Sequence, residues 1–256
     1  MNAINNVAIR RRVTCSKPIF NGVFLVVAAF LALLSGCSAL PDKPVRATLY
    51  DFGPGLVDAQ ASNRMAALAP IALADVEPAG VLEGSTTVLY RLAYSDGLQL
   101  RPYALARWSV PPAQLVRQIL REQLGLRRAV LNAGENAALV RVDGRLPLVV
   151  RVDLEEFSQL FTSPASSVGV VRLRVTLADN TPAGEQLLGQ RSFAVQRPAA
   201  SADAAGGVKA LADASNAAAV QIAEWLVQTE QARPLQTPAP TPAPTPAPAP
   251  APALKP

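Results

Sequence analysis

Two cysteines, Cys15 and Cys37, and the complete absence of histidine limit the chemistry open to this 256-residue chain. Without histidine, neither a Ser-His-Asp triad nor a Cys-His pair can form, and the usual zinc and haem ligands are missing. The sequence contains no Gly-x-x-x-x-Gly-Lys-Ser/Thr phosphate loop and no convincing Gly-x-Gly-x-x-Gly motif. Carboxylate-only or Ser-Lys chemistry stays open, but nothing marks a site for it. We therefore expect a protein that is not an enzyme and that uses no metal or other cofactor.

Cys37 directly follows a segment with the layout of a secretory signal. Residues 1–18 hold four cations and no anion, residues 19–34 are mostly apolar, and the small residues Ser35 and Gly36 precede the cysteine. A positive flank, an apolar middle and a small-residue cut site define a signal that is removed from the mature protein. An uncleaved signal anchor is the alternative, but such an anchor has no need to end in Gly-Cys.

The residues Leu34, Ser35, Gly36 and Cys37 resemble the lipobox of bacterial lipoproteins. The resemblance implies diacylglyceryl transfer to the Cys37 thiol, cleavage after Gly36, and acylation of the new amino terminus by a chain such as palmitate. Each buried methylene contributes about 0.8 kcal/mol, so two or three acyl chains hold a protein to a membrane without a transmembrane helix. Ser38 stands where a sorting aspartate would retain a lipoprotein in the inner membrane. The resemblance therefore favours the outer membrane, with the protein facing the periplasm.

The mature chain is close to neutral. The full sequence carries a formal charge of +5, and loss of residues 1–36 removes four cations, which leaves +1. Such a chain offers no basic surface for nucleic acid. With Cys15 removed and Cys37 acylated, no disulfide can form within one chain. Stability must come from a hydrophobic core, and roughly 185 residues between tether and tail are enough for a single domain.

Alternating and helical patterns predict the elements of the first half of this domain. Strands are expected at 48–52, 66–76, 86–94 and 98–103, the last two joined by a type I′ turn at Asp96-Gly97. A helix is expected over 113–124, with Pro111-Pro112 at its start and Gly125 as its stop. Its arginines, Arg117 and Arg121, could form an anionic-lipid patch or simply solvate the outer face, and we favour the second interpretation.

The second half gives the clearest strand pattern, at 147–178, where apolar and polar residues alternate. This pattern predicts a long antiparallel hairpin that turns at 162–166 and sets Arg172 and Arg174 near Asp153 and Glu155. A third strand at 187–196 and a helix within 203–228 complete the domain. The predicted fold class is α/β, a single domain with a mostly antiparallel or mixed sheet and a long hairpin, flanked by two main helices.

The chain therefore divides into a lipoprotein signal peptide (1–36), a lipidated tether (37–47), an α/β domain (48–232) and a Pro/Ala-rich tail (233–256). The tail cannot bury apolar surface and should adopt polyproline II conformation. At about 3.1 Å per residue it could reach roughly 70 Å. It is either a spacer or peptidoglycan-contacting arm, or a solvated tail with no required role.

The order of features between residues 86 and 228 resembles the ABC-type transport auxiliary lipoprotein family (paraquat-inducible protein C-like). The residues that carry the resemblance are Val88-Leu89-Tyr90-Arg91, the run from Tyr103 to Pro112 (YALARWSVPP), and the helical segments 207–214 and 222–226. Arg107-Trp108 followed by two prolines is the most specific of these motifs. The Pro/Ala tail departs from the family pattern.

The resemblance implies an α/β fold and a non-catalytic role beside an inner-membrane ABC permease and ATPase. It also implies a mammalian-cell-entry-domain protein as partner, which forms a periplasmic conduit for phospholipid between the membranes. The auxiliary lipoprotein docks or receives the far end of that conduit. Ring-shaped homo-oligomers suit this arrangement, because a tube end built from several copies calls for several docking copies.

Three residues of the specific motif, Tyr103, Arg107 and Trp108, are the candidate contacts for the conduit or for a lipid head group. The alternative is structural: Trp108 packs in the core, Arg107 caps a carbonyl or pairs with a carboxylate, and Tyr103 supports the hairpin. A rival function for the chain is a structural, cell-wall-associated lipoprotein that uses its Pro/Ala tail. A solute-binding lipoprotein fits less well, because the mature chain is short for two lobes.

Overall fold

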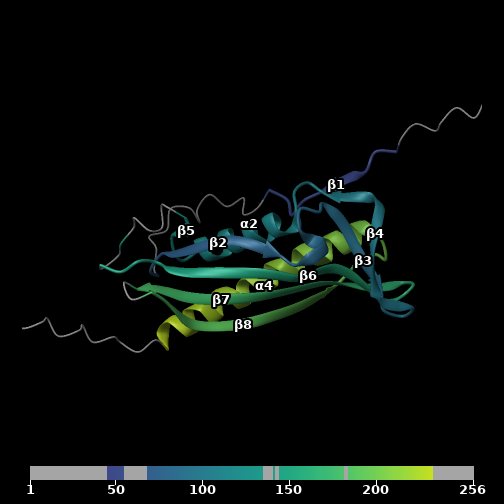
Figure 1. Ribbon diagram of the computed structural model, residues 1–256. Coiled ribbons are helices and arrows are strands. Elements are labelled where there is room, and N and C mark those ends of the chain that lie inside the picture. The colour runs from purple at the N-terminus through teal and green to yellow at the C-terminus, as the bar shows by residue number, and fades with distance from the viewer. Residues whose placement is uncertain (1–44, 55–67, 135–140, 142–143, 182–183, 233–256) are drawn as a thin grey trace, which may run out of the picture. The chain divides into compact units, whose positions relative to one another are not determined.

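The computed structural model describes residues 45–54, 68–134, 141, 144–181 and 184–232. In chain order the elements are β1 (Thr48–Tyr50), β2 (Ile71–Pro78), the 3-10 helix η3 (Gly80–Leu82), β3 (Thr87–Leu92), β4 (Asp96–Trp108), α2 (Pro112–Gly125), β5 (Val130–Asn132), β6 (Leu148–Ser163), β7 (Ser166–Thr181), β8 (Gly184–Pro198) and α4 (Ala204–Gln231) (Figure 1). The eight described strands form one mixed sheet, and α2 and α4 are its two main helices. The predicted α/β single domain with a mixed sheet is confirmed.

The long strand β6 organises the sheet. One of its edges is shared, because β2 pairs in parallel with its first half and β3 pairs in parallel with its last residues. Its other edge pairs antiparallel with β7 along nearly its whole length, and β7 pairs antiparallel with β8. Beyond β3 the sheet continues to β4 and β1, and beyond β2 to β5. The predicted hairpin and third strand are therefore present, and each strand is longer than expected.

Alternation of apolar and polar side chains places the core on one face of the hairpin. Its members in β7 are fully buried: Val171, Leu173, Val175 and Leu177. On the opposite face Arg172 and Arg174 both form ion pairs with Glu155, one of the two carboxylates predicted to lie near them; the other, Asp153, is opposite Arg174 in the register.

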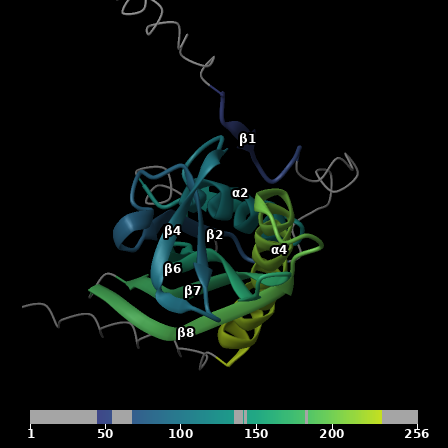
Figure 2. The same ribbon diagram turned by 90° about the vertical axis from the view of Figure 1, so that its right-hand side faces the viewer.

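Both helices contribute their apolar faces to the same hydrophobic core. Helix α2 begins at Pro112, whose missing N–H costs nothing at a first turn, and it buries Leu115, Val116, Ile119, Leu120 and Leu124. Helix α4 begins after Asp203, whose carboxylate accepts the Gly206 N–H at 2.8 Å. It packs on β7 and β8 and contacts α2 (Figure 2).

Several sequence predictions need correction. The β3–β4 hairpin turns at residues 93–95, not at Asp96-Gly97, and Gly97 does not have the positive φ that a type I′ turn requires. Strand β2 starts at Ile71, and residues 68–70 of the predicted strand precede it, while residues 66 and 67 lie outside the described residues. Gly125 belongs to α2, whose C-cap is Leu126. The short strand β5 was not foreseen.

Candidate functional site

The predicted signal and lipobox, with Leu34, Ser35, Gly36 and Cys37, lie outside the described residues. The same holds for residues 37–44 of the tether and for the tail from residue 233 onward. Acylation of Cys37 is therefore a prediction from sequence. The described chain begins at Val45, and β1 is its first element.

Trp108 lies in the core and is 1% exposed. Its ring contacts the rings of Phe52 and Phe157, with centroids 5.6 and 5.5 Å apart. In the described part of the chain its Nε1–H has no hydrogen-bond partner. This burial supports the packing interpretation of Trp108 and leaves no surface through which its ring could touch a partner.

Arg107 closes an irregularity in the β3–β4 ladder. Between the pairs Thr87–Arg107 and Leu89–Pro102, two steps along β3 correspond to five along β4. A bulge of this kind leaves backbone carbonyls without ladder partners. The Arg107 Nη1 donates to the carbonyls of Tyr103 at 2.6 Å and Ala106 at 2.8 Å, both within the bulge. Arg107 thus caps carbonyls, as the structural alternative expected.

Tyr103 belongs to a polar network at the start of α4. Its hydroxyl donates to the Gln159 Oε1 at 2.8 Å, and the Gln159 Nε2 donates to the Ser167 hydroxyl at 2.7 Å. Gln159 is fully buried, and Gly207 of α4 lies so close that a Cβ there would be 2.0 Å from the Gln159 Oε1. Burial, followed by the nearby Tyr90 and Asp203, raises the pKa of Tyr103 to about 12, so the hydroxyl remains a donor.

Sequence reasoning missed Gln159, because a bulge in β6 interrupts the alternation of buried and exposed residues before it. Buried positions in β6 run through Val150, Val152 and Leu154, and after an irregularity at Leu154–Glu156 they continue as Phe157, Gln159 and Phe161. The bulge moves the buried face from even to odd residues. The three motif residues are therefore close in the chain but differ in role: a core ring, a bulge cap and a network donor.

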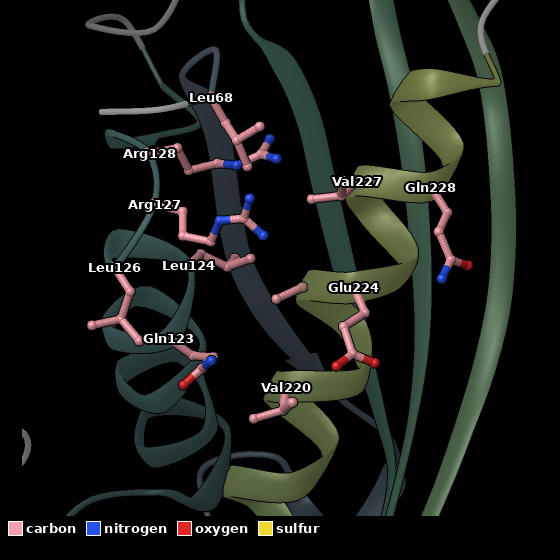
Figure 3. Close-up of a pocket in the computed structure, with 11 residues that line it drawn as sticks. Leu68, Gln123, Leu124, Leu126, Arg127, Arg128, Val220, Glu224, Val227 and Gln228 are labelled. Atoms are coloured by element: carbon pink, nitrogen blue, oxygen red, sulfur yellow. The ribbon is translucent and has the colours of Figure 1, made fainter. Parts of the chain in front are cut away.

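A groove of about 500 Å³ between the helices was also missed, because its residues come from three separate segments (Figure 3). Its lining is mostly apolar, with charged groups from both sides: Leu68, Gln123, Leu124, Leu126, Arg127, Arg128, Val220, Ala223, Glu224, Val227 and Gln228. Arg128 is buried and forms an ion pair with Glu230 at 2.5 Å. Arg127, which follows the end of α2, and Glu224 of α4 are both exposed. This volume falls in the range of small-molecule sites.

Within the described ranges, no three acidic, cysteine or histidine side chains gather closely enough to hold a metal ion. Among the same residues, no helix has the length and apolar character needed to cross a membrane. The described candidate residues provide hydrogen-bonding groups, the Arg127 guanidinium at the groove, and apolar surface. These features suit a binding role.

Comparison with known proteins defines the class. Residues 50–223 match the family described as ABC-type transport auxiliary lipoprotein component. In fold, the chain is similar to protein XCC0632 from Xanthomonas campestris, with 17% identity over 73% of this chain and 94% of that one, and a TM-score of 0.53. It is also similar to an uncharacterized protein, with 15% identity over 71% of this chain and 99% of that one, and a TM-score of 0.52. No curated protein matches the chain.

The match spans well over half of the sequence, so the chain belongs to the ABC-type transport auxiliary lipoprotein family. The resemblance drawn from the residue motifs is confirmed. The family is an auxiliary component of transport, and its lipoprotein character agrees with a membrane-anchored location.

Proposed function

We propose that this protein is a non-catalytic lipoprotein, held in the outer membrane by acylated Cys37 and facing the periplasm. It docks or receives the periplasmic conduit of an ABC-type system that moves phospholipid between membranes. Its partners are then a mammalian-cell-entry-domain protein and the inner-membrane permease and ATPase. The observation that carries the proposal is the family match over residues 50–223, in a chain whose N-terminus resembles a lipobox.

The arrangement of the domain supports a docking role. Strands β1 and β4 lie at one end of the domain, and β5 and the last turns of α4 lie toward the other end (Figure 1). The tether from Cys37 is joined to the domain at β1, so the proposed anchor is connected to the chain at this end. The groove between α2 and α4 includes the last turns of α4 and is the better candidate for a partner arriving from across the periplasm.

Crosslinking and capture of the intact, lipidated protein tests the proposal. We expect an entry-domain protein and its ATPase to be recovered, and recovery of neither would contradict the proposed partners. Val220→Glu adds a charge at an exposed groove residue, and Leu187→Glu adds the same charge at an exposed residue of β8. Recovery should fall for Val220→Glu and stay unchanged for Leu187→Glu if the groove takes part.

A second candidate function rests on the tail. Helix α4 ends at Gln231, at the end of the domain opposite β1 (Figure 1), and residues 233–256 follow it in the sequence. A cell-wall-associated lipoprotein would use such a position to reach peptidoglycan. Deletion of residues 233–256 should then abolish function and peptidoglycan binding without unfolding the domain, whereas the transport hypothesis expects partner capture to survive the deletion.

A further inference from the structure

Exposed large apolar side chains are concentrated on one part of the domain. Across the described residues seven such side chains are exposed, and four of them lie on β1, on β4 or in the turn between β3 and β4: Leu49, Tyr94, Leu98 and Leu105. Leu98 is 93% exposed, the highest value among the seven. We call these four residues the β4 strip. The other exposed residues outside the tether, Leu187 and Val220, are isolated on β8 and α4.

The β4 strip follows an open strand edge. Strand β1 covers β4 only at Ala106–Trp108, and no other described strand pairs with the outer edge of β4 between Asp96 and Leu105. An exposed apolar edge strand invites unwanted pairing unless something covers it. The strip should therefore be covered in the working protein.

The exposure of Leu98 is built into the hairpin. The Arg91 guanidinium forms two hydrogen bonds of 3.2 Å to the Glu156 carboxylate and donates to the carbonyls of Gly97 at 3.4 Å and Leu98 at 3.1 Å. The Leu98 N–H donates to the Asp96 Oδ1 at 3.1 Å. These contacts fix the backbone on both sides of Leu98, so its side chain is held outward.

The strip also lies where the chain arrives from its anchor. Nine residue-to-residue steps lead from Cys37 to Arg46, so even a fully extended tether spans at most about 32 Å. Strand β1 follows directly and carries Leu49, and β1, β3 and β4 lie at the same end of the domain (Figure 1). The membrane that holds Cys37 is therefore within short reach of this end.

We propose that the β4 strip lies on the lipid surface in which Cys37 is anchored, as a second contact made by the folded domain itself. The inference rests on the acylation of Cys37 that the proposed function includes. Apolar side chains at an interface insert among the headgroups, and headgroups and water satisfy the polar groups of the open edge. The contact would orient the domain, with the last turns of α4 directed away from the membrane.

The charges near the strip are compatible with a headgroup layer. Arg46 is exposed, and Arg101 is partly exposed beside the Gln99 side chain, to which it donates; both cations can attract lipid phosphates. The two carboxylates in the same segments, Asp51 and Asp96, accept the N–H groups of Gly53 and Leu98 and keep their negative charge. The two arginines balance these two carboxylates, so the four groups together carry no net charge.

Single-cysteine labelling of the full-length, lipidated protein tests the proposal. In the mature chain Cys37 is blocked by acylation and Cys15 is gone, so Leu98→Cys or Leu105→Cys can carry one environment-sensitive NBD label. The protein is reconstituted in phosphatidylethanolamine–phosphatidylglycerol vesicles, with or without nitroxide-bearing lipid. Matched controls are Leu187→Cys and Val220→Cys, which are exposed but lie outside the strip.

We expect a blue-shifted emission for the Leu98 and Leu105 labels and a loss of that emission with nitroxide lipid, with neither change at the controls. Water-like emission at all four positions, from a protein that is lipidated, would overturn the inference alone. A blue shift that grows with protein density and resists the quencher would also overturn it, because a second copy then covers the strip. A free Cys37 thiol, seen as a second label by mass spectrometry, would overturn the proposed function and this inference together.

Discussion

The β6–β7–β8 region and the β3–β4 region fix the register of their strands in different ways. The β6–β7 ladder shifts register twice and the β7–β8 ladder once, over strands of 15 or 16 residues, whereas β3 and β4 lose register twice within the six residues of β3. In the first region apolar alternation and the close approach of α4 set the structure. In the second region individual polar side chains do so, through Arg107 on bulge carbonyls and Arg91 on the hairpin.

The two regions differ in how well they tolerate the loss of a single side chain. A ladder defined by repeated alternation tolerates the loss of one surface side chain, because the remaining pairs still fix the register. A bulge held by one guanidinium has no such redundancy. The irregular region also carries the exposed apolar strip, so the part of the fold with the least repetition has the most surface for external contacts.

The largest effect is expected where α4 crosses β7. A Cβ on Gly169 would lie 2.6 Å from both the Ala210 carbonyl carbon and the Leu211 nitrogen, which are backbone atoms and cannot rotate away. Gly169→Ala should therefore lower the free energy of unfolding by about 3 kcal/mol through overpacking. Gly97→Ala is the matched control, since its Cβ would meet only the Ala93 Cα at 3.5 Å. Equal urea midpoints for the two variants would contradict the close-approach argument.

The polar network should give an intermediate effect with a pH signature. Tyr103→Phe leaves the buried Gln159 Oε1 without its donor, which should cost about 1–2 kcal/mol near neutral pH. The pKa of Tyr103 is raised to about 12, so the folded state holds its proton over a range where the unfolded chain releases it. Stability from this group is complete below pH 10 and is lost between pH 10 and 12.

The measurement is the unfolding free energy of wild type and Tyr103→Phe at pH 8 and pH 11. Because Tyr103 is only half buried, the difference between the two proteins should shrink by about 1 kcal/mol at the higher pH. Tyr94→Phe removes the hydroxyl of an exposed tyrosine and should leave the free energy of unfolding at pH 8 within about 0.5 kcal/mol of wild type. A constant difference across this range would rule out the raised pKa.

The contrast between the regions also explains what the sequence could predict. The β7 core, the ion pairs of Glu155 and the face of α2 follow from alternation and helical spacing, and all were predicted. The burial of Gln159 was not, because a bulge shifts the alternation by one residue and no local pattern announces it. The prediction of a turn at Asp96-Gly97 was wrong, because both residues belong to β4. The Arg91 guanidinium donates to the carbonyls of Gly97 and Leu98, a contact that a local turn pattern does not contain.

The same limit applies to the candidate sites. The motif around Arg107 and Trp108 signalled the family, and the structure gives these two residues structural partners. The groove could not be predicted, because it depends on how α2, α4 and Leu68 come together. Neither could the β4 strip, since an exposed leucine in sequence looks the same as a buried one.

A smaller effect should follow from removing the cap of the bulge. Arg107→Met keeps the aliphatic stem but removes both bonds to the carbonyls of Tyr103 and Ala106, at a cost of about 1 kcal/mol. Arg101→Met removes only a bond to the exposed Gln99 side chain and should stay within about 0.5 kcal/mol of wild type. If Arg107→Met left stability unchanged and weakened partner capture, Arg107 would be a docking residue rather than a bulge cap.

The smallest effect is expected on the solvent face of the regular region. Glu155 pairs with Arg172 at 3.2 Å and also with Arg174, and both arginines are about half exposed. Glu155→Gln should therefore lower the free energy of unfolding by only about 0.5–1 kcal/mol, and 1 M salt should remove most of that difference. Asp213→Asn breaks the more exposed pair with Lys209 on α4 and should cost still less. A loss above 2 kcal/mol at Glu155 would mean that single polar contacts, and not alternation, hold the register of this hairpin as well, and the distinction between the two regions would fail.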